Sequence, residues 1–216
     1  MAAVSSREEV VAAFDAFGDA VSGLADLSFE ALTTPERLAL LGRLERNLRR
    51  LPVARHALIN GVRQQASAAE IGGKLSHVLA DRLGITRGDA NRRIEEAGDL
   101  GQRRALTGEP LSARLAATAA AQRQGLLGEG HVRVIRGFLH ELPCWIDGPT
   151  REHAEAQLAQ FAAQYRPEVL AKLAAKLAEV LNPDGEFSDA DRARRRALTL
   201  GPQDRDGMSA LRGWLT

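Results

Sequence analysis

The stretch KLSHVLADRLGITRGDANRRIEEAGDL, residues 74–100, decides how this chain is interpreted, because its spacing predicts two short helices joined by a tight corner. Apolar residues recur at helical intervals on both sides of Gly84, among them Leu79 before it and Ile94 after it. Gly84 can take the left-handed conformation that ends a helix, and the Thr86 side chain can cap the helix that follows. The pattern therefore favours a helix-turn-helix over an arbitrary helical hairpin.

The outward face of the second predicted helix carries side chains that can read DNA. Arg87, Asn91 and Arg92 are of the types that pair with guanine and adenine edges in the major groove, and Arg93 can contact phosphate. Acidic neighbours such as Asp89 dilute the positive charge, so the alternative is a surface corner without any role in DNA binding. A DNA-reading role requires Arg87, Asn91 and Arg92 to lie exposed on one face, clear of the acidic side chains.

Length and composition point to a mostly helical protein. The chain has 216 residues, of which 44% are hydrophobic, so it can bury a sizeable core. Aromatic residues make up only 4% of the sequence, and alanine and leucine supply most of the apolar side chains. A β-sandwich would need more β-branched and aromatic residues. We therefore expect a mostly α fold, a multi-helix bundle that contains the helix-turn-helix-like corner.

The charge balance limits the kinds of binding partner, and the single cysteine indicates the cellular compartment. The 29 basic and 28 acidic residues leave a formal net charge of +1, so any basic surface must be local. Cys144 alone excludes an internal disulfide and a cysteine-based zinc site, and it favours a cytoplasmic location. The sequence contains no recognisable signal peptide and no apolar run of transmembrane length, so we expect no membrane partner.

The N-terminal third of the chain predicts two helical segments. Residues 5–23 predict a first helix with one apolar docking face. The apolar residues from Leu41 to Val62 then follow alternating spacings of three and four, as in a coiled-coil seam. Because proline removes a helical hydrogen bond, Pro52 predicts a bend near Leu51.

Local signals predict the helices that follow the corner. Residues 101–110 read as a break between helices, Thr150 is expected to cap one later helix, and Pro167 is expected to begin another. Cys144 and Trp145 are expected to pack into a junction between helices. A nucleophilic cysteine needs an adjacent general base, and no motif in the sequence places one beside the Cys144 thiol.

The character of the chain changes at the tetrapeptide 182–185, Asn-Pro-Asp-Gly. Beyond it, residues 188–196 predict a short basic helix and residues 197–215 a β-hairpin. A hairpin alone is marginally stable in water, so it must dock on the helices, pair with another chain or continue into a further module. We therefore expect a helical domain at 1–182 and, at 183–216, the start of a longer region.

Four segments of the chain carry a resemblance to a known family. They are TPERLALLGRLERNLRRL (34–51), LADRLGITRGDANRRIEEAGDL (79–100), EGHVRVIRGFLHELP (129–143) and, most specific of all, RRRALTLGPQDRDGMSALRGWLT (194–216) with its DGM and RGWLT. Over nearly its whole length the chain resembles the actinobacterial domain of unknown function 222, also called the 13E12 repeat family of mycobacteria. The resemblance implies a mostly helical N-terminal region that usually precedes an HNH nuclease module, often in proteins carried as repeated or mobile genetic elements.

The nuclease site itself is not expected within this chain. An HNH site needs a histidine base and a second His or Asn for the metal, often on a scaffold braced by zinc. The five histidines lack that spacing, and Thr216 falls where family members typically continue toward the nuclease. We therefore predict no enzyme activity, catalytic residue, metal ligand, cofactor or small-molecule substrate. We expect each histidine on the surface or at the edge of the core: His56, His77, His131, His140 and His153.

Two functions remain open. The first is a non-catalytic domain of an HNH endonuclease-like protein that binds or targets duplex DNA through Arg87, Asn91, Arg92 and Arg93. The basic C-terminal helix would then supply a clamp on the DNA backbone, made by Arg192, Arg194, Arg195 and Arg196. The alternative is a self-association or protein-interaction module with no nucleic-acid role, in which the apolar seam and the hairpin form a homodimer or hold a missing partner domain. The two can coexist, because twofold proteins read paired half-sites.

Overall fold

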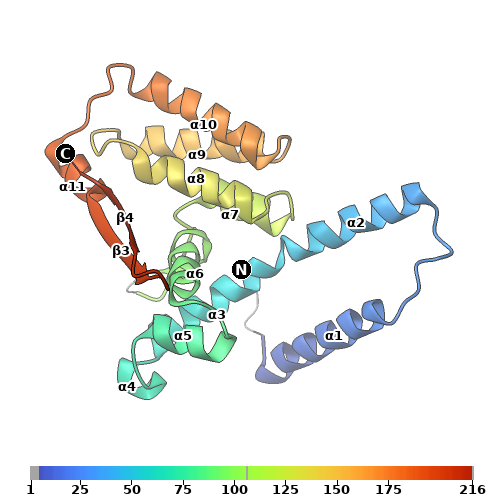
Figure 1. Cartoon of the computed structure of the whole chain (residues 1–216). Coiled ribbons are helices and arrows are strands. Elements are labelled where there is room, and N and C mark those ends of the chain that lie inside the picture. Colours follow the sequence, from blue (N-terminus) through green and yellow to red (C-terminus); the bar gives the residue numbers. More distant parts are fainter. Residues whose placement is uncertain (1–4, 106, 216) are drawn as a thin grey trace. The chain divides into compact units, whose positions relative to one another are not determined.

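The computed structural model describes residues 5–105 and 107–215, and the chain is mostly α-helical (Figure 1). Its internal contacts divide it into two units, Met1–Leu44 and Glu45–Thr216. Residues 183–215 thus belong to the same unit as residues 45–182. None of the described helices combines the length and the apolar character that crossing a membrane requires.

The smaller unit contains α1 (Arg7–Ala25) and most of α2 (Thr34–Leu48). α1 begins with a capping box, in which the Ser6 hydroxyl accepts from the Glu9 N–H at 3.1 Å and the Glu9 carboxylate accepts from the Ser6 N–H. Neither helix buries a side chain, and Phe14 on the apolar face of α1 remains 52% exposed. The described part of this unit therefore has no core of its own.

The larger unit combines helices with two short antiparallel hairpins. The hairpin β1–β2 falls mainly in residues 101–110, which the sequence predicted as a break between helices, and the short helix α4 was not predicted. The elements of this unit are α3 (Leu51–Gln65), α4 (Ala68–Ile71), α5 (Leu75–Leu83), α6 (Arg87–Leu100), β1 (Arg103–Arg104), β2 (Pro110–Leu111), α7 (Ala116–Arg123), α8 (Glu129–Glu141), α9 (Gly148–Ala162), α10 (Pro167–Leu181), α11 (Asp189–Arg195), β3 (Ala197–Gln203) and β4 (Ser209–Trp214).

The hydrophobic core lies among α8, α9 and α10, which Figure 1 shows side by side, with α7 packed against α9. Leu127, Ile135, Leu158 and Leu170 have no exposed surface and form its centre. Small alanines of α9 and α10 fill the spaces between these larger side chains, which lets the helices approach closely. This packing is what the alanine- and leucine-rich composition predicted.

A second group, α3 with α5 and α6, carries the predicted corner. Ile59 of α3 is buried, while Leu58, one of the leucines of the predicted seam, remains 53% exposed. Arg55 of α3, which interrupts the apolar pattern between Leu51 and Leu58, has its Nη2 atom 3.8 Å from the carboxylate of Glu96, which is buried on α6. The break in the apolar pattern at Arg55 thus corresponds to an ion pair that joins α3 to α6.

Several local expectations need correction. Pro52 does not kink a continuous helix: α2 ends at Leu48, and Pro52 lies in the first turn of α3, where its missing N–H costs no helical hydrogen bond. Thr150 does not cap α9, because the cap is Asp147, whose carboxylate accepts from the Thr150 N–H at 2.7 Å.

The positions predicted for Cys144, Trp145 and two of the histidines also need correction. Trp145 is 54% exposed and Cys144 is exposed, while their neighbour Ile146 is buried in the core. His56 is 1% exposed and His131 is 5% exposed, so neither lies at the surface. The His131 ring accepts from the Gly128 N–H and donates to the Tyr165 carbonyl, and it therefore links the start of α8 to the end of α9.

The C-terminal region has the predicted helix and hairpin. Ser188 caps α11 by accepting from the Asp191 N–H at 3.1 Å. The buried Asp191 carboxylate in turn accepts from the backbone N–H groups of Ser188 and Cys144, both at 2.9 Å. Strands β3 and β4 pair antiparallel, with Leu200 opposite Leu211, and both leucines are more than 60% exposed. One carboxylate thus connects the C-terminal region to the turn after α8.

Candidate nucleic-acid interface

The corner between α5 and α6 has the local geometry that the sequence predicted. Gly84 ends α5 in the left-handed conformation, with φ 64° and ψ 36°. The Thr86 hydroxyl caps α6 by accepting from the Asp89 N–H at 3.1 Å. Ala80 and Ala90 are 6% and 0% exposed, so small side chains let the two helices approach closely. The corner is therefore a tight turn between two closely packed short helices.

Two of the predicted DNA-reading residues lie on one exposed face of α6. Arg87 and Asn91 are exposed, and their spacing of four places them on the same side of α6, near its N-terminus. In helix-turn-helix proteins the N-terminal residues of the second helix contact base edges. The exposed pair is thus positioned as such a contact requires.

Arg92 does not meet the condition set by the sequence, because it is paired with acidic side chains, and Arg93, which was expected to contact phosphate, is paired as well. Arg92 donates to Asp89 on its own helix and to Glu129 in the first turn of α8. Arg93 lies 2.8 Å from the same Asp89, and the hydrogen bond from Arg92 holds the pKa of the Asp89 carboxyl below its usual range. Both arginines thus pair within α6, and Arg92 also ties α6 to α8.

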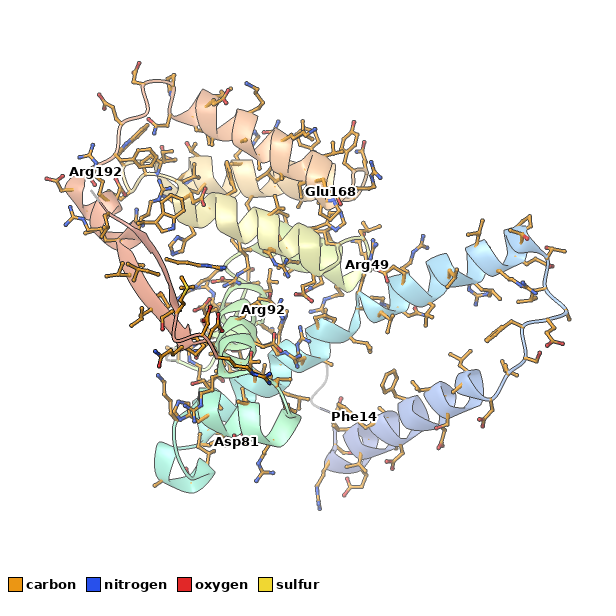
Figure 2. The ribbon with its side chains drawn as sticks, in the orientation of Figure 1. Phe14, Arg49, Asp81, Arg92, Glu168 and Arg192 are labelled. Carbon is orange, nitrogen blue, oxygen red and sulfur yellow. The ribbon has the colours of Figure 1, made fainter. Side chains whose placement is uncertain are left out.

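The arginines of α11 are separate from the corner, and most are engaged locally. Figure 2 shows Arg192 well away from Arg92 of α6. Arg192 pairs with exposed Asp189, Arg194 pairs with buried Asp191, and the Arg195 guanidinium lies 5.7 and 5.9 Å from the ring centres of Phe187 and Trp214. Arg196 is exposed and belongs to no ion pair in the described part of the chain. The predicted clamp therefore keeps few free positive charges.

A groove of about 610 Å³ runs beside α6, and no pattern in the sequence predicted it; we call it the α6 groove. It brings together residues from α3, α5, α6, the segment before α7, and α8. They are Arg63, Lys74, Leu75, Ser76, Asn91, Ile94, Glu95, Gly98, Asp99, Arg114, Arg136 and His140. Because its basic residues are scattered over some 75 positions of the sequence, only the fold gathers them.

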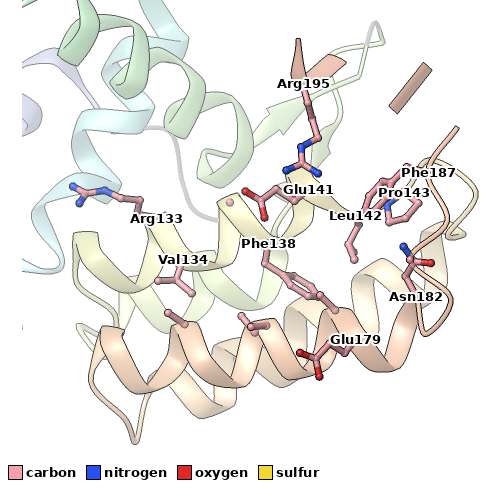
Figure 3. Close-up of a pocket in the computed structure, with 16 residues that line it drawn as sticks. Arg133, Val134, Phe138, Glu141, Leu142, Pro143, Glu179, Asn182, Phe187 and Arg195 are labelled. Carbon is pink, nitrogen blue, oxygen red and sulfur yellow. The ribbon is translucent and has the colours of Figure 1, made fainter. Parts of the chain in front are cut away.

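Another hollow, of about 460 Å³, lies between α8 and α10 (Figure 3). Phe138, Leu142, Phe187 and the alanines of α10 make it mainly apolar. Over residues 5–105 and 107–215, no three side chains of the His, Cys, Asp and Glu types gather closely enough to hold a metal ion together.

Comparison with known proteins places the chain in a family. The family described as "Domain of unknown function (DUF222)" matches residues 38–216. The chain is 59% identical over 212 residues to an uncharacterized protein of Mycobacterium tuberculosis strain H37Rv, an alignment that covers 98% of this chain and 47% of that protein. A second uncharacterized protein of that strain is 57% identical over 212 residues, with the same two coverages. An uncharacterized protein of Mycobacterium bovis is 54% identical over 211 residues, which cover 98% of this chain and 46% of that protein.

The chain thus spans about half the length of the curated relatives that it matches. No solved structure resembles it significantly. Because the family match covers most of the chain and includes both the corner and the C-terminal hairpin, this protein belongs to the DUF222 family.

Proposed function

We propose that this chain is a non-catalytic, cytoplasmic domain that binds duplex DNA and targets a longer, mobile-element-associated HNH endonuclease-like protein to it. The observation that carries the proposal is the exposed pair Arg87 and Asn91 at the start of α6, directly after the tight corner that Gly84 and Thr86 form. The alignment to about half of each longer relative is consistent with a nuclease module elsewhere in those proteins.

The proposed reading unit is smaller than the sequence suggested. In this proposal Arg87 and Asn91 supply the base contacts, whereas Arg92 ties α6 to Glu129 of α8 and Arg93 pairs with Asp89 of its own helix. Substitution of Arg92 is therefore expected to affect the fold first and DNA binding only as a consequence.

The test is fluorescence anisotropy of labelled random-sequence duplexes at 50 and 200 mM salt, followed by sequencing of the duplexes that bind. The wild-type chain should bind at low salt, lose affinity as salt rises, and enrich a preferred sequence. Removal of one base-contacting side chain, by Arg87→Ala or Asn91→Ala, should cost about 1–3 kcal/mol of binding free energy on the preferred sequence. The matched control is Arg123→Ala, which removes an exposed arginine from the end of α7. Absence of binding by the wild-type chain at low salt would overturn the proposal.

A second candidate function, self-association, is favoured by the smaller unit. Apolar residues of α1 repeat at spacings of four and three, with exposed fractions between 43% and 52%: Val10, Phe14, Phe17, Val21 and Leu24. Such an apolar stripe without a core needs a covering surface. α1 has a net charge of −3 and α2 of +1, so exchange of α1 and α2 between two copies pairs opposite charges.

Light scattering across a hundredfold range of protein concentration tests this second function. The wild-type chain should show a dimer whose fraction rises with concentration, and Phe14→Ser with Phe17→Ser should shift it to a monomer. Val180→Ser, which removes a single 74% exposed apolar side chain from α10, should leave the dimer intact. A wild-type chain that stays monomeric throughout would exclude self-association.

A further inference from the structure

We propose that the α6 groove binds the sugar-phosphate backbone of duplex DNA, and that Arg63, Lys74 and Arg114 neutralise its phosphates. This inference rests on the proposed function and deepens it, because it moves the backbone contacts from α11 to a site beside α6. Asn91 belongs to both the exposed face of α6 and the groove, so the two contact surfaces are continuous.

The charges of the groove favour an anion. Its lining holds four basic side chains, Arg63, Lys74, Arg114 and Arg136, against the two carboxylates of Glu95 and Asp99. Arg136 already serves both carboxylates, with its Nε atom 2.8 Å from Asp99 and its Nη2 atom 3.6 Å from Glu95. The remaining three cations therefore face the groove as an excess of positive charge, and a concave basic surface attracts polyanions.

Two of these three cations, Arg63 and Lys74, have no acidic partner among the described residues. The Arg63 guanidinium lies over Gly98 of α6, where a Cβ atom would be 3.5 Å from its Nη1 atom. Lys74 is exposed and fixed by the start of α5, since its carbonyl accepts from the N–H groups of His77 and Val78. Neither side chain is in an ion pair within the described residues.

Arg114 is placed by the segment that leads into α7. The Leu115 N–H donates to the Asp99 carbonyl at 3.0 Å, which fixes this segment against the end of α6. The Arg114 side chain is 66% exposed, and its Nη1 atom lies 4.0 Å from the Asp99 carboxylate, which Arg136 already neutralises. Arg114 can therefore turn toward a phosphate at little cost, as arginine commonly does in protein–DNA contacts.

The size and openness of the groove favour a polymer backbone over a small enclosed ligand. The volume of about 610 Å³ is bordered by exposed side chains, including Lys74, Asn91 and His140. Arginine, lysine and asparagine side chains all donate hydrogen bonds to phosphate oxygens. A strand that passes along the groove would thus lie next to the bases that Arg87 and Asn91 are proposed to read.

The test is the double variant Arg63→Ala with Lys74→Ala, measured by anisotropy on duplex DNA at several salt concentrations. Each lost phosphate contact should lower the slope of log affinity against log salt by about 0.9, so the double variant should lose about 1.8. The matched control is Arg123→Ala with Lys172→Ala, which removes the same two charges from exposed positions on α7 and α10 and should leave the slope unchanged. Circular dichroism of both variants establishes that each is folded, and Lys74→Ala alone serves if the double variant is not.

The outcomes separate this inference from the proposed function. If the wild-type chain binds duplex DNA and the groove variants show an unchanged slope, the proposal that the α6 groove binds the DNA backbone is overturned. The proposed base contacts of α6 would then still stand. Failure of the wild-type chain to bind duplex DNA at low salt would overturn both. Further arms use single-stranded DNA of the same sequence and a free nucleoside triphosphate as competitors. Tighter binding of either one than of the duplex would overturn the assignment to a duplex backbone.

Discussion

His56 shows how strongly the fold can change the chemistry of one residue. Its side chain is 1% exposed, and its Nε2 atom has no hydrogen-bond partner in the described part of the chain. Burial, with the positive charges of Arg55 and Arg136 adding to it, lowers the pKa of His56 to about 4. A buried neutral imidazole is therefore part of the packing of α3, and it resists protonation in mild acid.

This lowered pKa predicts a loss of stability on acidification. The unfolded chain binds a proton at His56 near pH 6.5, while the folded chain does so only near pH 4. Stability due to this group is therefore complete above about pH 6.5 and is lost as the pH falls from there to about 4, by up to about 3 kcal/mol. Urea unfolding at pH 7.5 and pH 5 should show the loss, and His56→Gln should reduce the difference between the two pH values. An equal difference in the variant would contradict this prediction.

At the residue scale, the sequence could not show which side chains from distant positions pair in the fold. The sequence predicted Arg87, Asn91, Arg92 and Arg93 on one helix, but only the fold brings Glu129 to Arg92. Buried Glu155 of α9 similarly accepts from the Thr118 N–H at 2.6 Å and caps the start of α7 from another helix. Pairings between positions 37 apart leave no periodic signal along the chain.

Single elements could be predicted wherever the signal is local. Gly84 and Thr86 determine the corner because a left-handed glycine and a capping hydroxyl act within one turn of backbone. The strands β1 and β2 have two residues each, too few for an alternating pattern, so the sequence suggested only a break there. Asp147 and Thr150 are both capping residue types, and the choice between them depends on where the preceding turn ends.

The corner makes a prediction at this scale through Gly84→Ala. No neighbouring atom lies within 4 Å of a Cβ at this position, so the cost comes from the left-handed backbone alone and should be about 1–2 kcal/mol. Gly137→Ala in α8 also meets no atom within 4 Å, but its backbone is helical, so it should stabilise the protein by up to about 1 kcal/mol. Urea unfolding measures the free energy of unfolding of both variants. Equal changes in the two would show that an alanine side chain at position 84 causes no backbone strain.

At the scale of the whole molecule, composition was the most useful guide. The alanine- and leucine-rich, aromatic-poor sequence predicted packed helices, and the core among α8, α9 and α10 is built from those residues. The division of the chain within α2 could not be predicted, because it depends on the absence of buried contacts in the smaller unit and not on a linker signal. The α6 groove likewise exists only once α3, α5, α6 and α8 are assembled.

The attachment of the C-terminal region to the helical core depends on Asp191. This buried carboxylate accepts hydrogen bonds from Ser188, the Cys144 N–H and Arg194, and the hydrogen bonds from Ser188 are the main reason that its pKa lies far below the usual range.

Asp191→Asn removes the charge at nearly constant shape and should release α11 and the hairpin, because an amide cannot accept all of these bonds. Limited trypsin digestion should then cleave after the α11 arginines much faster than in the wild type. Asp189→Asn is the matched control, since Asp189 is exposed and its one ion pair among the described residues is with Arg192, and its digestion rate should match the wild type. Equal resistance of Asp191→Asn and the wild type would mean that the hairpin and α11 are held by contacts other than this carboxylate.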